Sequence, residues 1–217
     1  FPIISALILL PTIGSLFLFF SKSNNENNLT VKYVALFTSV VNFLLSIYLW
    51  FLFDLNTSEF QFVEDRNWLL GLVNYKVGID GISILFIILT TFITPLCIIS
   101  VNNTIKVRLR DFLIAILIME SFMIGVFCSL DLVVFYLFFE AGLIPMFLII
   151  GIWGGPKRVY SAFKFFLFTL LGSVLMLVAI ISIYWIAGTT DVVQLYEIRI
   201  DAKYQNLLWL AFFSSFA

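Results

Sequence analysis

The chain has 217 residues, of which 62% are hydrophobic and 12% are charged, and its formal net charge is −1. An ordinary soluble domain is about half apolar and about a quarter charged, so a soluble fold is excluded. The near-neutral charge implies no basic surface for nucleic acid. Histidine is absent, and the two cysteines, Cys97 and Cys128, lie inside apolar runs. Neither a disulfide framework nor a metal site is therefore indicated.

Six apolar runs are long enough to cross a bilayer, whose core of about 30 Å needs roughly 20 helical residues. Strands of a membrane barrel would alternate apolar and polar residues over about 10 positions, whereas these runs are apolar on every face. The sequence predicts an all-α, polytopic transmembrane helix bundle with spans at Pro2–Phe20, Val31–Phe53, Ile79–Ser100, Phe112–Ser129, Leu130–Trp153 and Tyr160–Ala187.

A seventh apolar run, Leu207–Ala217, follows the polar segment 188–206. Its eleven residues would reach only about 16 Å as a helix, which is too short to cross. We expect it to be the start of a seventh membrane helix, in a chain that forms the front part of a longer membrane protein. The alternative is that a second polypeptide completes this helix.

Basic residues in the loops predict the orientation, because cytoplasmic loops carry an excess of Lys and Arg. Seven lie after the first, third and fifth spans, and four lie after the second, fourth and sixth spans. The N-terminus is therefore predicted to lie opposite the cytoplasm or mitochondrial matrix. The first set is Lys22, Lys32, Lys106, Arg108, Arg110, Lys157 and Arg158, and the second is Arg66, Lys76, Arg199 and Lys203.

Five charged residues fall within or at the edge of the apolar runs: Asp80, Glu120, Asp131, Glu140 and Lys164. A charge at mid-membrane costs at least about 2.5 kcal/mol on insertion scales and usually has a function. Asp80 and Asp131 stand where helices are expected to begin, so each is either an ordinary helix-N-terminal aspartate or a functional group. The first interpretation is favoured for Asp131, and neither is favoured for Asp80.

Glu120 and Glu140 stand on the fourth and fifth spans, which form a hairpin turning near Leu130. Each is ten residues from that turn, or about 15 Å along its helix, so both are expected near the membrane midplane at similar depth. One interpretation is a pair of hydrogen-bonded glutamates that hold helices together. The favoured interpretation is proton transfer, because a carboxyl group in an apolar setting changes protonation when a nearby cation moves.

Lys164 is about 12 Å along the sixth span from Pro156, and its long side chain either reaches back to the surface or serves a function inside. Its depth differs from that of Glu140 by about 12 Å, so a direct salt bridge is not expected. Internal water or another side chain would have to connect them.

Nucleotide-binding loops, paired-cysteine motifs and Ser/His/Asp sets are missing from the sequence, so no bound nucleotide, metal or electron carrier is predicted.

Several motifs resemble those of subunit 4 of respiratory complex I, the M-type antiporter-like membrane subunit. They are Gly78–Ser83, Ser129–Glu140, Leu143–Met146, Trp153–Gly154 and Lys164–Ser173. The resemblance covers essentially the whole chain and is specific between Asp131 and Ser173. It implies an antiporter-like fold of fourteen helices, with helices four to eight and nine to thirteen as inverted repeats. Residues 1–111 would then hold the first three helices, and residues 112–217 the start of the first repeat.

The resemblance also implies roles for individual residues. Glu140 matches the family's helix-five glutamate, linked to proton uptake or coupling between subunits, while Glu120 and Lys164 match positions that would be its relay partners. The family's lysine on helix seven would fall just after Ala217. The implied function is proton translocation in NADH:ubiquinone oxidoreductase, with NADH, FMN, iron–sulfur clusters and ubiquinone held by other subunits and no cofactor in this chain.

The implied location is the mitochondrial inner membrane or a bacterial inner membrane. The implied partners are neighbouring antiporter-like subunits and other membrane-arm subunits, membrane lipid, and a second polypeptide carrying helices seven to fourteen if the gene is divided. Two further hypotheses stay open. One is a subunit of a multisubunit cation/proton antiporter or membrane-bound hydrogenase, and the other is a structural remnant that pumps nothing.

Overall fold

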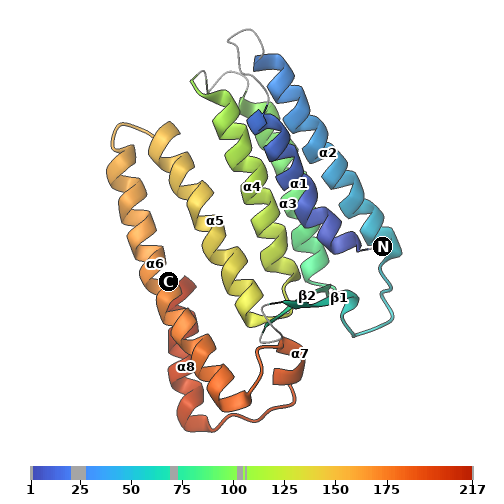
Figure 1. Cartoon of the computed structure of the whole chain (residues 1–217), viewed down its shortest axis with the longest axis vertical. Coiled ribbons are helices and arrows are strands. Elements are labelled where there is room, and N and C mark those ends of the chain that lie inside the picture. The colour runs from blue at the N-terminus through green and yellow to red at the C-terminus, as the bar shows by residue number, and fades with distance from the viewer. Residues whose placement is uncertain (1, 21–27, 69–72, 102–104, 106, 217) are drawn as a thin grey trace. The chain divides into compact units, whose positions relative to one another are not determined.

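The computed structural model describes residues 2–20, 28–68, 73–101, 105 and 107–216. Within these residues six helices are long and apolar enough to cross a membrane (Figure 1). They confirm the six predicted spans, with ends that differ by at most four residues. Their bounds are α1 Ile3–Phe20, α2 Asn28–Leu52, α3 Ser83–Ser100, α4 Leu109–Cys128, α5 Leu132–Trp153 and α6 Arg158–Ala187.

The chain divides into two compact units, which we call unit 1 and unit 2. Unit 1 comprises Phe1–Glu64 and Gly78–Cys128 and holds α1 to α4. Unit 2 comprises Asp65–Val77 and Ser129–Ala217 and holds α5, α6 and two shorter helices. These units are defined by packing, and the predicted repeat boundary after residue 111 stays a prediction.

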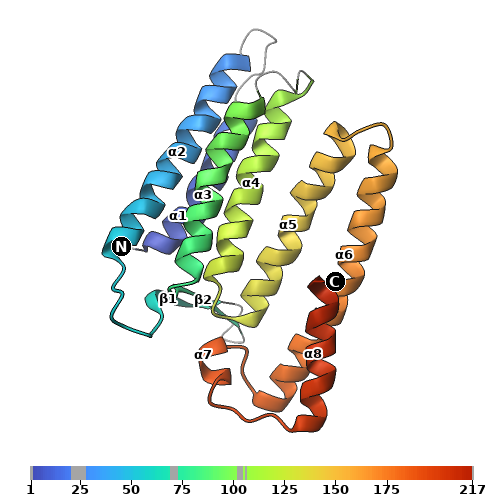
Figure 2. The same cartoon turned by 180° about the vertical axis from the view of Figure 1, so that it is seen from behind.

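In unit 1, α1 packs against α2 and α4, and α3 packs against α2 and α4. Figure 2 shows α3 and α4 side by side. Fully buried aliphatic side chains from α1, α3 and α4 fill the centre, among them Leu7, Ile87 and Leu117. The first turn of α1 leaves backbone N–H groups without partners inside the helix. Glu64 accepts hydrogen bonds from two of them, Ile4 N at 2.9 Å and Ser5 N at 3.3 Å.

A two-stranded sheet of β1 (Gln61–Trp68) and β2 (Val73–Ile79) lies between α2 and α3, where the sequence analysis predicts no strand. The predicted start of the third helix at Ile79 is wrong, because Ile79 ends β2 and α3 begins only at Ser83. Val77 and Ile79 are both fully buried. A buried apolar strand that runs directly into an apolar helix gives one continuous hydrophobic run, so the sequence pattern hides the boundary.

In unit 2, α5 and α6 pack together, and rings of Phe163 and Phe166 lie 5.5 and 5.2 Å from the ring of Phe147. Helix α6 ends at Ala187, and the capping residue Gly188 has a φ of 74°, the left-handed conformation that glycine adopts without a steric penalty. The short helix α7 (Val192–Leu195) follows. Helix α8 (Ala202–Phe216) then packs against α6, and it begins five residues before the seventh predicted run, Leu207–Ala217.

Candidate functional site

Glu120 is buried in unit 1, with 2% of its surface exposed, near the middle of α4. Asn42 of α2, with no exposed surface, donates a hydrogen bond from Nδ2 to Glu120 Oε1 at 2.9 Å. The other oxygens of the two side chains, Glu120 Oε2 and Asn42 Oδ1, are buried and have no hydrogen-bond partner among the residues that the structure describes. The carboxyl group of Glu120, which the sequence predicts as a functional group, is therefore hydrogen-bonded to an amide side chain of another helix.

Asn42 belongs to a polar face of α2 that the sequence analysis missed. Ser39, Asn42 and Ser46 are all fully buried, and their spacing of three and four residues places them on one side of the helix. The Ser46 hydroxyl hydrogen-bonds the Thr91 hydroxyl of α3 at 2.7 Å. That spacing was the available signal in the sequence. Uncharged polar residues are a weaker indication of function in an apolar run than carboxylates are.

Glu140 lies on α5 in unit 2, about 12 Å along the helix from Leu132. The side chain is half-buried, and its Oε2 is buried without a hydrogen-bond partner in the described part of the chain. Tyr136, one turn earlier on the same helix, shares a side-chain hydrogen bond with Ser173 of α6. Glu140 thus sits beside a polar contact between α5 and α6.

Lys164 lies on α6 with an exposed side chain, and no ion pair joins it to Glu140 in the part of the chain that the structure describes. This agrees with the expectation that the two residues do not form a direct salt bridge. Glu120 belongs to unit 1, whereas Glu140 and Lys164 belong to unit 2. The predicted equal depth of the two glutamates therefore stays a prediction.

Asp131 and Asp80 both stand just before helices. The Asp131 carboxylate accepts hydrogen bonds from Val133 N at 2.8 Å and Val134 N at 3.2 Å, which confirms it as the N-cap of α5. Asp80 accepts from Ser83 N at 2.7 Å. Burial raises the pKa of Asp80, but hydrogen bonds from Ser83 and from the backbone lower it, and the pKa lies below its ordinary value of 3.8.

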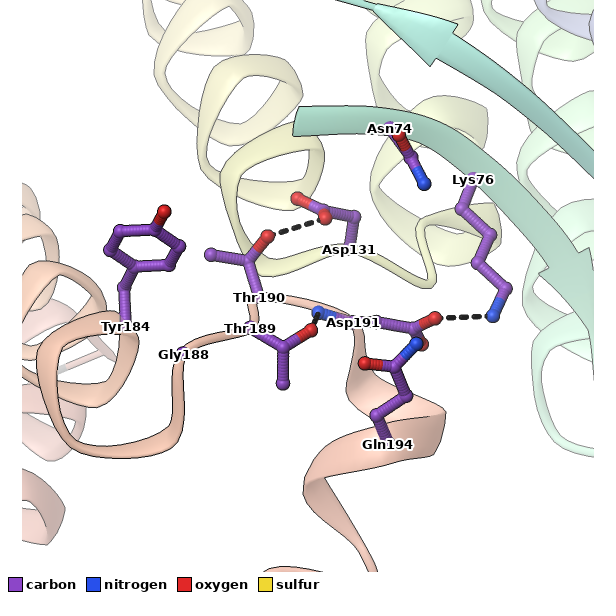
Figure 3. Close-up of a pocket in the computed structure, with 9 residues that line it drawn as sticks. All are labelled: Asn74, Lys76, Asp131, Tyr184, Gly188, Thr189, Thr190, Asp191 and Gln194. Atoms are coloured by element: carbon purple, nitrogen blue, oxygen red, sulfur yellow. Dashed lines mark hydrogen bonds and ion pairs between the residues drawn. The ribbon is translucent and has the colours of Figure 1, made fainter. Parts of the chain in front are cut away.

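A polar pocket of about 180 Å³ lies in unit 2 beside the start of α5 and the end of α6 (Figure 3). Lys76 of β2 forms an ion pair with Asp191 at 2.5 Å, and Thr190 Oγ1 donates to Asp131 Oδ2 at 2.6 Å. Backbone hydrogen bonds join Leu130 to both Lys76 and Val192. The pocket is lined by Asn74, Lys76, Asp131, Tyr184, Gly188, Thr189, Thr190, Asp191 and Gln194.

These contacts tie three segments that are far apart in the sequence, namely β2, the entry to α5 and the segment leading into α7. Both aspartates in the pocket already have partners, since Asp191 also accepts from Val193 N at 2.9 Å. Among the described residues, no group of three or more His, Cys, Asp or Glu side chains could hold a metal ion. The polar groups of the pocket therefore have a structural role, because they hold together the segments at this end of unit 2.

Helices long enough to span a membrane, with carboxyl groups inside them, define a multi-pass membrane protein with polar groups within its spans. A family model described as NADH:quinone oxidoreductase/Mrp antiporter, transmembrane, matches residues 129–217. The chain as a whole matches the N-terminal part of relatives named NADH-quinone oxidoreductase subunit M or NADH-ubiquinone oxidoreductase chain 4.

Two curated relatives illustrate the match. Subunit M of Rhodobacter capsulatus is 55% identical over 199 residues, which cover 86% of this chain and 38% of the relative. Chain 4 of Marchantia polymorpha is 46% identical over 216 residues, which cover 99% of this chain and 43% of the relative. The chain thus spans about two fifths of the length of these relatives, and the resemblance to the M-type subunit is confirmed.

Two solved structures have a similar fold. A chain of respiratory complex I from Thermus thermophilus with bound NADH superposes with a TM-score of 0.84 at 28% identity, covering 99% of this chain and 43% of that chain. A chain of an archaeal membrane-bound sulfane sulfur reductase superposes with a TM-score of 0.80 at 22% identity, covering 97% of this chain and 32% of that chain. The second likeness shows the fold alone.

Proposed function

We propose that this chain is part of a proton-translocating membrane-arm subunit of NADH:quinone oxidoreductase, with Glu140 as its principal proton-handling group. The observation that carries the proposal is a mid-helix glutamate with a buried, unpartnered oxygen, in a chain whose relatives are named as subunits of that enzyme. An unpaired buried carboxyl oxygen is energetically costly because it loses its hydrogen bonds to water. A glutamate that is kept in such a position inside a membrane helix usually has a function.

In this proposal Glu140 binds a proton in the interior of unit 2 and releases it when the local charge changes. Tyr136 and Ser173 extend the polar contact from α5 to α6, so they offer a hydrogen-bonded route beside the carboxyl group. Lys164 acts as a cation on α6 that reaches Glu140 through water or another side chain. Glu120 serves as a second carboxyl group in unit 1.

The remaining parts of the proposal concern the whole assembly. The chain itself holds no cofactor, and electron transfer takes place in other subunits of a multisubunit inner-membrane complex. Neighbouring antiporter-like subunits and membrane lipid are the proposed partners. Because the relatives come from both mitochondria and bacteria, either a mitochondrial or a bacterial inner membrane fits the proposal.

The competing functions make different predictions. The family description also includes Mrp antiporters, and a subunit of that kind would support sodium-dependent transport without NADH oxidation. Relatives at 55% and 46% identity that are named as NADH oxidoreductase subunits weigh against it. A structural remnant would tolerate neutral replacement of Glu140.

The test is Glu140→Gln in the intact complex, reconstituted into vesicles so that NADH oxidation and proton translocation are measured together. A general acid–base group contributes about 10²–10⁴-fold to proton transfer, so we expect fewer protons moved per NADH oxidised. Glu197→Gln is the matched control, because Glu197 is an exposed residue of the same unit. A Glu140→Gln complex with the full proton yield would leave the structural-remnant interpretation in place.

A further inference from the structure

The Asn42–Glu120 pair of unit 1 combines two unusual features. Its members are joined by one hydrogen bond, and each also carries a buried oxygen that has no hydrogen-bond partner within the described residues. Asn42 Oδ1 accepts hydrogen bonds only. Glu120 Oε2 is a second acceptor if the glutamate is ionised, but it is a donor if the glutamate is protonated.

The protonated form makes the two unpaired atoms complementary. When Glu120 Oε2 carries a proton, its O–H group is a donor and Asn42 Oδ1 is an acceptor that needs one. A small side-chain rotation or one bridging water would allow this hydrogen bond to form. The ionised form would leave two buried acceptors and a charge unsatisfied. Burial of unpaired polar groups, and above all of an unpaired charge, is strongly unfavourable.

The charges on the four helices of unit 1 favour the protonated form of Glu120 as well. Helices α1 and α3 contain no Asp, Glu, Lys or Arg. The cations of α2 and α4, Lys32 and Arg110, lie ten residues before Asn42 and Glu120, or about 15 Å along each helix. Asp111 stands beside Arg110, and the other titratable groups of these helices are Tyr33, Tyr48, Cys97 and Cys128.

Of the three buried polar residues Ser39, Asn42 and Ser46 on this face of α2, Asn42 is the one that hydrogen-bonds Glu120. Ser39 donates to Leu36 O at 3.0 Å, within its own helix. Ser46 donates to Phe43 O at 2.7 Å and contacts Thr91 of α3. Of these three fully buried polar residues, Asn42 is the one bonded to α4, so it positions the carboxyl group.

We infer that Asn42 and Glu120 form a carboxamide–carboxylic acid pair, which holds one proton on Glu120 Oε2 in the interior of unit 1. Asn42 is the positioning residue of this proton-holding site. The inference stands apart from the proposed proton translocation, because the pair holds its proton whether or not that proton moves during turnover.

The experiment is infrared spectroscopy of the intact complex near neutral pH. The carbonyl stretch of a protonated carboxyl group is separate from that of a carboxylate, and the band that disappears in Glu120→Gln belongs to Glu120. Asn42→Leu removes the donor to Oε1, so we expect this band to move to higher frequency. Asn42→Ser provides a second variant, since serine already occupies this face at Ser39 and Ser46.

Ser46→Ala is the matched control, because it deletes a buried hydrogen bond between α2 and α3 without touching Glu120. Its band should stay in place. The inference is overturned if wild type shows no acid band that Glu120→Gln removes, or if neither Asn42 variant moves that band. A normal band shift together with unchanged proton translocation in Glu120→Gln would support the site and reject Glu120 as a relay partner.

Discussion

The Asp131 carboxylate joins two structural tasks in one side chain. It caps α5 through Val133 and Val134, and it accepts a hydrogen bond from Thr190. Loss of an N-cap costs about 0.5–2 kcal/mol, so Asp131→Ala should lower the melting temperature of the purified complex. Asp131→Asn keeps an acceptor oxygen for the helix N–H groups and should lose less. Equal losses in the two variants would contradict the capping role.

Asp80 should make the stability of unit 1 depend on pH. Burial raises the pKa of Asp80, but hydrogen bonds from Ser83 and from the backbone of Ile82 and Asp80 together lower it below its ordinary value in the folded chain. The ionised side chain therefore stabilises the fold above its ordinary pKa of 3.8, and this contribution is lost as pH falls through the lower folded value. Asp80→Asn should reduce the melting temperature near neutral pH and show a shallower decline in acid.

The control for Asp80→Asn is Glu59→Gln, an exposed carboxyl group of the same unit. This variant should follow the wild-type melting curve at each pH. A wild-type advantage over Asp80→Asn that persists unchanged well below pH of about 3 would show that the stabilisation does not come from ionisation.

At single positions, the sequence predicts the charged residues inside the spans but does not predict their hydrogen-bond partners. Glu120, Glu140 and Asp131 stood out because a carboxyl group in an apolar run is costly. Asn42 is uncharged, and its importance arises only from the packing of α2 against α4, which brings Nδ2 to 2.9 Å from Glu120. The amide partner of a buried acid depends on tertiary contacts, which periodicity along one helix does not contain.

At the scale of helices and strands, long apolar runs were predictable and the hairpin was not. A membrane helix needs many consecutive apolar residues, which is a strong local signal. Strands β1 and β2 have eight and seven residues, and they depend on pairing with each other. Short strands without a clean alternation carry little information in sequence, so the third span is predicted to begin at Ile79, whereas α3 begins at Ser83.

Gly172 decides how closely α6 and α8 approach. A Cβ added there would lie 2.6 Å from Ser214 O and 3.0 Å from Ser215 Cα, so backbone would have to move. We expect Gly172→Ala to separate α8 from α6, with a stability loss of about 1–3 kcal/mol as for overpacked sites. Faster protease cleavage between α7 and α8 in the intact complex would report the separation.

The matched control is Gly151→Ala, which faces the same helix from α5. Its added Cβ would lie 3.5 Å from Ala162 Cβ, an ordinary contact distance. Cleavage in this variant should resemble that of wild type. If Gly172→Ala also behaves as wild type, α8 adapts without cost and the close approach is not required.

Over the whole molecule, the outer surface of the spans is apolar. Large side chains such as Phe20, Phe51 and Trp185 have 80%, 80% and 84% of their surface exposed. Exposed apolar surface of this extent marks contact with membrane or with other proteins. Hydropathy therefore predicted the membrane environment of the chain, whereas the partners that cover each face depend on surface shape.

The loop charges make a prediction about topology that belongs to the chain as a whole. Seven basic residues after the odd-numbered spans against four after the even-numbered spans place the N-terminus on the periplasmic or intermembrane side. Lys22 and Lys106 of the first set lie outside the described residues. Single cysteines at Asn56 and Gly155 would test the prediction, because both positions are exposed and they follow the second and fifth spans.

Both cysteines would be introduced into a Cys97→Ser background, since Cys97 is exposed and Cys128 is buried. A reagent that cannot cross the membrane should label Asn56→Cys from the periplasmic or intermembrane side. Gly155→Cys should react only after the membrane is opened, because an odd number of spans separates the two positions. Reversed labelling would show that loop charge does not set the orientation, and labelling from one side would show that the count of spans is wrong.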